Sequence, residues 1–112
     1  MIDLYEFGRI VIDGRQYQKD VFVGPDKVSD WKRVSGHAVY EDDVRQVIGE
    51  QPEIIIIGNG ADSIMQVGQE VHDFFADKKI PLIVKDSAAA CEEYNRLKKE
   101  GKRVAALIHL TC

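Results

Sequence analysis

Four consecutive isoleucines, residues 54–57, lead directly into the turn Gly58-Asn59-Gly60. An unbroken run of β-branched residues is typical of a strand that is buried on both faces of a parallel sheet. In open α/β sheets, ligand sites lie at the carboxyl ends of such strands, and glycines there let the backbone turn sharply. The segment therefore predicts an α/β fold and marks the first place to look for a site.

Helices and strands are predicted to alternate over about residues 41–112. Apolar residues recur with helical spacing in 41–48 and 62–76, and a third helix lies between an Asp86-Ser87 cap and a stop at Gly101. Ile64 and Ala88 are expected on the buried faces of the second and third helices. Apolar runs at 82–84 and 104–110 predict strands beside 54–57. Together these elements predict a three-layer domain with helices on both faces of the sheet.

The first third of the chain predicts β structure. Asp13-Gly14 separates the runs 7–12 and 15–23, and this dipeptide favours a type I′ hairpin turn because both of its positions need positive φ. The turn sets a register in which Ile10 pairs with Tyr17. We therefore expect a single domain, residues 1–112, with an N-terminal β-hairpin region at about 5–24 that extends or covers the sheet.

Composition narrows the classes of function. The chain has 112 residues and a formal net charge of −4, which argues against nucleic acid as a partner because phosphate binding needs clustered Lys and Arg. No apolar run approaches the ~20 residues of a membrane span, and the first residues lack the pattern of a signal peptide. We expect a cytoplasmic protein without membrane contact, in which Cys91 and Cys112 are free thiols.

The turn after the isoleucine run has two interpretations. As an anion site, its backbone N–H groups would face a ligand, and Asp86 would take the place of a ribose-binding acid. Against a nucleotide, Ser63 stands at the third glycine of the dinucleotide pattern, and Asp62 would repel a phosphate. The alternative is a structural turn between strand and helix. The candidate ligand or partner cleft is lined by Gly58, Asn59, Gly60, Ser63, Asp86, Arg33 and His37.

No set of residues converges on a reaction. The three histidines lack the spacing of a metal site and have no Cys pair beside them: His37, His72 and His109. His109 and Cys112 are three apart on a strand and so point to opposite faces, which disfavours a nucleophilic dyad. Trp31 is either a core anchor whose N–H meets a carbonyl or, with Arg33, part of a pocket mouth. We predict no catalytic residue, metal or cofactor.

The C-terminal third carries a specific series of motifs: Tyr94-Asn95-x-Leu97, then Gly101-x-Arg103-Val104, then His109-x-Thr111-Cys112. With the glycine turn and a Trp31-x-Arg33-x-x-Gly36-His37 segment, the chain resembles the Mth938-domain family over nearly its whole length. The resemblance implies a three-layer fold around a mixed, mostly parallel sheet with one antiparallel strand. The family-motif positions are Trp31, Tyr94, Asn95, His109, Thr111 and Cys112.

The resemblance also implies a function class. No enzymatic activity is established for the family, which is distantly related to a mitochondrial complex I assembly factor. We therefore expect a domain of unknown biochemical function that is a non-enzymatic protein-interaction or assembly module. It would bind an unknown protein partner and exist as a monomer or small homo-oligomer. The alternative is an enzyme or a small-molecule or anion binder that uses the cleft at Gly58-Asn59-Gly60.

Overall fold

Strand β10 (Val104–Ile108) lies at the centre of a five-stranded sheet, and all five of its residues are buried. In the computed structural model, which describes residues 1–112, the strand order is β5-β4-β10-β7-β9. The isoleucine run forms β7 (Ile54–Gly58), which pairs in parallel with β10, and β9 (Leu82–Lys85) pairs in parallel with β7. The α/β class and the buried central strand are confirmed.

The five-stranded sheet is mixed, so the prediction of a mixed, mostly parallel sheet agrees with the structure only in part. β4 (Val21–Val23) runs antiparallel to β10 on one side and to β5 (Val28–Asp30) on the other. Four strands therefore share one direction and β4 opposes them, but two of the four pairings are antiparallel. β4 and β5 are antiparallel because the short turn at residues 24–27, closed by a hydrogen bond from the Gly24 N–H to the Lys27 carbonyl, reverses the chain between them.

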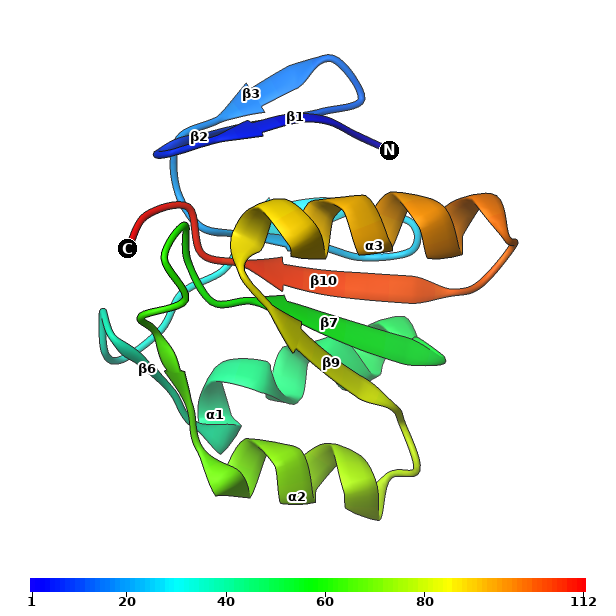
Figure 1. Cartoon of the computed structure of the whole chain (residues 1–112). Coiled ribbons are helices and arrows are strands. Elements are labelled where there is room, and N and C mark those ends of the chain that lie inside the picture. Colours follow the sequence, from blue (N-terminus) through cyan, green and yellow to red (C-terminus); the bar gives the residue numbers. More distant parts are fainter.

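Helices cover both faces of the sheet (Figure 1). α3 (Ser87–Lys99) lies on one face, and α1 (Glu41–Val44), the 3₁₀ helix η1 (Arg45–Glu50) and α2 (Gln69–Asp77) lie on the other. Alternate residues of β10 serve the two cores: Ala106 packs with α3 residues, and Leu107 packs with Phe75 of α2. None of these helices has the length and apolar character needed to cross a membrane.

The N-terminal residues form a separate antiparallel sheet of three strands, β1 (Ile2–Glu6), β2 (Arg9–Ile12) and β3 (Arg15–Tyr17). Ile10 pairs with Tyr17, as the turn predicted, and Asp13 and Gly14 have φ values of 49° and 81°. The prediction of one strand over 15–23 is wrong: β3 ends at Tyr17, and the chain crosses to the main sheet before Val21.

The predicted helix over 62–76 is wrong in its first half. Residues 62–65 form a loop, and β8 (Gln66–Val67) pairs in parallel with β6 (Ala38–Val39) before α2 begins at Gln69. Ile64, expected on a buried face, is exposed. Ser63 has φ of 58°, which lies outside the right-handed helical region. The N–H group of Asp62 donates to the Cys112 carbonyl instead of to a helical partner, so long-range bonding holds this segment in a loop.

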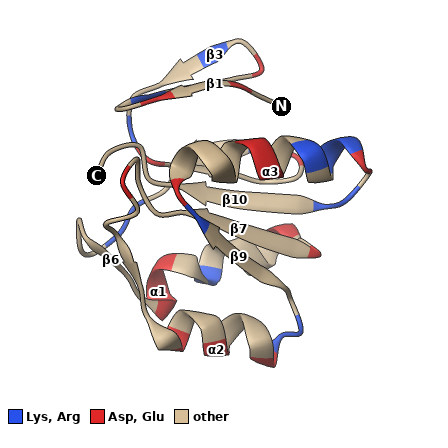
Figure 2. Cartoon of the chain, viewed as in Figure 1, with Lys and Arg blue, Asp and Glu red and all other residues tan.

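The third helix follows its sequence signals closely. Asp86 caps it by accepting from the Ala89 N–H. At its end, Gly101 has φ of 83°, and the N–H of Lys102 returns to the Leu97 carbonyl, which completes a Schellman motif. Figure 2 shows basic residues in its last turn, where they complement the helix dipole. One expected inward residue was wrong: Ala88 is exposed, and Ala90 is buried in its place.

Asn95 joins this helix to the N-terminal sheet, and its loss should destabilise the domain. Its side chain donates to the Ile2 carbonyl at 2.7 Å and accepts from the Ile2 N–H at 2.8 Å. Asn95→Ala should lower the free energy of unfolding by about 1–3 kcal/mol, because two strand groups lose their partners. Urea unfolding checks this, with exposed Lys19→Ala expected within about 0.5 kcal/mol of wild type. Equal stability of the two variants would contradict the assignment.

Candidate functional site

A buried ionic cluster lies where β10 ends and β4 begins. The Asp20 carboxylate forms an ion pair with the Arg33 guanidinium and lies 2.7 Å from His109 Nδ1. The same carboxylate accepts a 2.9 Å hydrogen bond from the Leu110 N–H. The Arg33 and His109 side chains are only 6% and 7% exposed. Segments from three distant parts of the sequence therefore meet at one carboxylate.

The cluster has part of the geometry of a catalytic site. His109 Nδ1 lies 2.7 Å from an Asp20 carboxylate oxygen and 2.9 Å from an Arg33 guanidinium nitrogen, so the acid and the guanidinium together fix the orientation of the ring. An acid that orients a histidine in this way is one half of a nucleophile-activating arrangement. Here, however, His109 Nε2 is buried and has no hydrogen-bond partner, hydroxyl or thiol included. The cluster joins segments of the fold and does not present the free ring nitrogen of His109 to solvent.

Trp31 and Arg33 lie inside the fold rather than at a pocket mouth. The indole N–H of Trp31 donates to the Asp43 carbonyl at 2.9 Å, and Trp31 is buried, as expected for a core anchor. The Arg33 guanidinium stacks over the Trp31 ring at 4.8 Å and points toward Asp20. His37 is exposed. Arg33 and His37 therefore do not line one surface.

The N–H groups of the glycine turn all bond within the protein. The N–H of Gly60 donates to Ser87 Oγ at 3.0 Å, that of Ala61 to the Thr111 carbonyl at 3.2 Å, and that of Asp62 to the Cys112 carbonyl at 2.8 Å. The C-terminal segment thus occupies the position predicted for an anion. None of the three cavities of the structure borders the turn.

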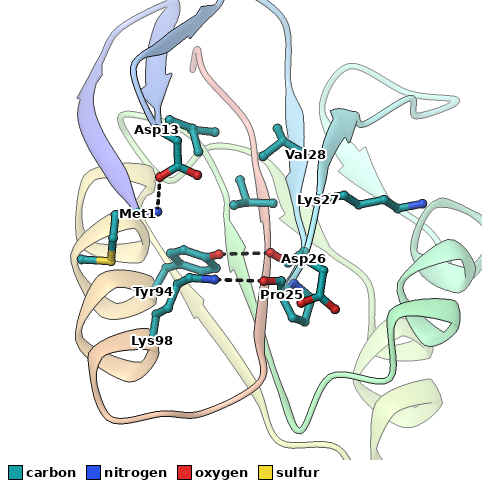
Figure 3. Close-up of a pocket in the computed structure, with 11 residues that line it drawn as sticks. Met1, Asp13, Pro25, Asp26, Lys27, Val28, Tyr94 and Lys98 are labelled. Carbon is teal, nitrogen blue, oxygen red and sulfur yellow. Dashed lines mark hydrogen bonds and ion pairs between the residues drawn. The ribbon is translucent and has the colours of Figure 1, made fainter.

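Two side chains of α3, Tyr94 and Lys98, attach that helix to the β4–β5 turn. They border a polar cavity of about 90 Å³ between the N-terminal sheet, this turn and the helix (Figure 3). Tyr94 Oη donates to the Gly24 carbonyl at 3.1 Å, and Lys98 Nζ donates to the Pro25 carbonyl at 3.0 Å. Burial raises the pKa of Tyr94 to about 12 and that of the Cys91 thiol to about 12. Both groups therefore stay protonated at neutral pH.

The structure brings most of the predicted residues to one edge, but not as a cleft. The glycine turn, Asp86 and His109 lie together there with the terminal segment, and Arg33 joins them through Asp20. Ser63 and His37 are exposed on loops. The sequence reasoning missed two residues, Asp20 and Ser87. A lone acid directly before the buried run 21–23 was the available signal for Asp20. No three His, Cys, Asp or Glu side chains gather as metal ligands would.

Removing the charge of Asp20 should strongly destabilise the fold. Asp20→Asn keeps the shape but leaves the Arg33 guanidinium buried without its carboxylate, which costs about 3–5 kcal/mol of unfolding free energy. Asp26→Asn is the matched control, because Asp26 makes an exposed ion pair with Arg103 that contributes at most about 1 kcal/mol. Chemical denaturation compares the two. A loss at Asp20 no larger than at Asp26 would refute the central role of the cluster.

A methyl group at Gly60 should disrupt the contacts between the glycine turn and the C-terminal segment. Gly60 has φ of 108°, and an added Cβ would lie 2.6 Å from the Thr111 carbonyl oxygen. Gly60→Ala should cost about 2–4 kcal/mol, from backbone strain and overpacking together. Gly14→Ala isolates the strain, since Gly14 also has positive φ but no atom lies within 4 Å of its added Cβ. Thermal unfolding should therefore rank Gly60→Ala well below Gly14→Ala.

Comparison with known proteins identifies the family. The model of a family described as "Protein of unknown function (DUF498/DUF598)" matches residues 2–109. The solved structure named MT938 is 28% identical, with all of this chain and 98% of that chain covered and a TM-score of 0.84. PH1505, a conserved hypothetical protein from Pyrococcus horikoshii OT3, has the same fold at 22% identity, with coverage of 100% and 99% and a TM-score of 0.89.

A third structure ties the fold to the resemblance seen in the motifs. A protein from Bordetella pertussis, described as an Mth938-like domain, is 17% identical over 98% of this chain and 85% of that chain, with a TM-score of 0.69. Its fold matches, and the resemblance to Mth938 proteins is confirmed. Because the family model spans nearly the whole chain, the protein belongs to the DUF498/DUF598 family, the Mth938-domain proteins of unknown function.

Proposed function

We propose that the protein is a non-enzymatic protein-interaction module whose contact surface is the β6–β8 flap, residues 34–40 and 64–67. Three of the five large apolar side chains exposed on the surface belong to this flap: Val34 at 87%, Ile64 at 53% and Tyr40 at 46%. Apolar side chains exposed on a surface favour association with another protein, because burying them releases ordered water. The exposure of three such side chains on these two paired segments carries the proposal.

The flap is held in a defined conformation, which favours binding. The Asp43 carboxylate accepts from the Val34 N–H at 3.2 Å and from the Tyr40 N–H at 2.8 Å. The pairing of β6 with β8 and a hydrogen bond from the Gln66 N–H to the His37 carbonyl hold the strand that follows Ile64. A surface that is ordered before binding loses little conformational entropy when a partner docks.

The polar groups at the carboxyl edge support an interaction module over an enzyme. Nucleophilic or general-base chemistry needs a group that can reach substrate. His109 Nε2 is enclosed, and the N–H groups of the glycine turn already have acceptors. A substrate at this edge would have to displace the C-terminal segment.

A matched pair of variants tests the flap. Val34→Ser with Ile64→Ser removes its two most exposed aliphatic side chains, and Leu4→Ser with Phe7→Ser removes similar exposed side chains from the N-terminal sheet. Quantitative mass spectrometry of tagged protein recovered from source cells should show partners bound by wild type and by the Leu4/Phe7 variant. The flap variant should recover about tenfold less, a loss of ~1.4 kcal/mol.

Two results would defeat this proposal. One is equal loss of partners in both variants, and the other is no reproducible partner at physiological salt. Thermal-shift measurements with inorganic phosphate and nucleotides test the ligand-binding alternative in parallel. A ligand present at 100 times its Kd would add roughly 2.7 kcal/mol to stability, whereas the proposal expects no shift.

A further inference from the structure

Strand β9 ends the main sheet and leaves one row of backbone groups without a neighbouring strand. It pairs only with β7, on its inner side. The Ile55 N–H donates to the Pro81 carbonyl and the Asn59 N–H to the Lys85 carbonyl. In a parallel pair, alternate residues of each strand direct their N–H and C=O groups to the neighbour. The groups of Leu82 and Val84 therefore point outward from the sheet.

A groove lies at the start of this open edge. It is an open depression of about 390 Å³ between the end of α2 and the first residues of β9. Its lining is half hydrophobic: His72, Ala76, Lys79, Ile80, Pro81 and Leu82. The first three residues of β9 are only half-buried and Lys85 is exposed, although the strand belongs to a core sheet. A strand laid along this edge would meet both unpaired backbone groups and an apolar depression for one of its side chains.

Lys79 has an unusual backbone conformation at this groove. The ends of α2 and α3 form the same hydrogen-bonded motif: Ile80 N–H returns to the Phe75 carbonyl as Lys102 N–H returns to Leu97. α3 places Gly101 at the left-handed position, but α2 places Lys79 there, with φ of 59°. A non-glycine residue in this conformation costs roughly 1–2 kcal/mol. Strained residues of this kind often occur at functional sites.

The charge of Lys79 is free to act on a partner. Its ammonium group forms no ion pair within the protein, whereas Lys85 at the other end of β9 is paired with Glu93 at 3.1 Å. Figure 2 shows basic residues at both ends of the strand. A cation next to an apolar groove favours a ligand that has a carboxylate beside an apolar side chain.

We propose that the outer edge of β9 binds an extended segment of a partner protein as a sixth strand of the sheet. The segment pairs with the outward groups of Leu82 and Val84, places an apolar side chain in the groove and sets an acidic side chain against Lys79. This mode of binding, strand addition, derives affinity from main-chain bonds and selectivity from the side-chain contacts. The site is separate from the flap and does not depend on it.

A second copy of the chain fits this edge less well. Antiparallel pairing of two β9 strands about Ile83 would set Lys85 diagonally across from Lys79 of the other copy. Like charges in neighbouring strand positions are destabilising, and lysines at sheet edges commonly prevent self-association. An acidic side chain on a partner segment would instead be attracted by the positive charge of Lys79.

Amide hydrogen exchange tests the pairing residue by residue. The probe is an array of synthetic seven-residue peptides in which Thr alternates with Val, Ile, Leu or Phe between terminal glutamates. Bound peptide should slow exchange at the Leu82 and Val84 amides about tenfold and leave those of Ile83 and Lys85, which face β7, unchanged. The same peptides with terminal lysines should bind more weakly. N-methylation of the peptide residues whose N–H groups face β9 should abolish binding. N-methylation of the residues between them, whose N–H groups face away from β9, should leave binding unchanged.

Lys79→Gly provides the matched variant. Glycine accepts the left-handed conformation, so the melting temperature should hold or rise, while affinity for the glutamate peptides should fall roughly threefold. The proposal is overturned if no peptide protects Leu82 and Val84, or if lysine peptides bind equally well. It is also overturned if both amides become protected at high protein concentration without peptide, since the occupant would then be a second copy.

Discussion

The rest of the structure depends on the contacts that the Asp20 carboxylate makes. The residue lies where the chain leaves the N-terminal sheet and enters the main sheet, and its backbone carbonyl accepts from the Trp31 N–H. Its side chain joins Arg33, His109 and the backbone of Leu110. Because Arg33 and His109 are buried, the carboxylate both neutralises charge and fixes the paths of three segments.

The segment after β10 depends on this anchor and in turn closes the carboxyl edge of the sheet. The His109 carbonyl accepts from Ser87 Oγ, and the carbonyls of Thr111 and Cys112 accept from the N–H groups of the glycine turn. The His-x-Thr-Cys motif therefore has a structural role in this chain. It satisfies, from within the protein, the donors that an α/β enzyme directs at its ligand.

Both proposed contact surfaces are formed by residues outside this closed edge. The flap presents apolar side chains on a framework held by Asp43, and the β9 edge presents unpaired backbone groups beside Lys79. The two proposed surfaces differ in chemistry: we expect the first to select a partner by burial of apolar area, and the second by strand pairing and charge. Because they lie on different elements, the two proposals do not depend on each other.

The sequence by itself determined the features that depend on neighbouring residues. These include the Asp13-Gly14 turn with its Ile10–Tyr17 register, the Asp86 cap, the Gly101 stop and the buried strand at the isoleucine run. Only the tertiary structure decided the rest. Residues 62–65 are not helical because their backbone is tied to the C-terminal segment, and the His109–Asp20 contact joins positions 89 residues apart. The pattern of neighbouring residues reflects only the interactions between them. The contacts named here stabilise conformations that form only when a residue distant in the sequence is already in position.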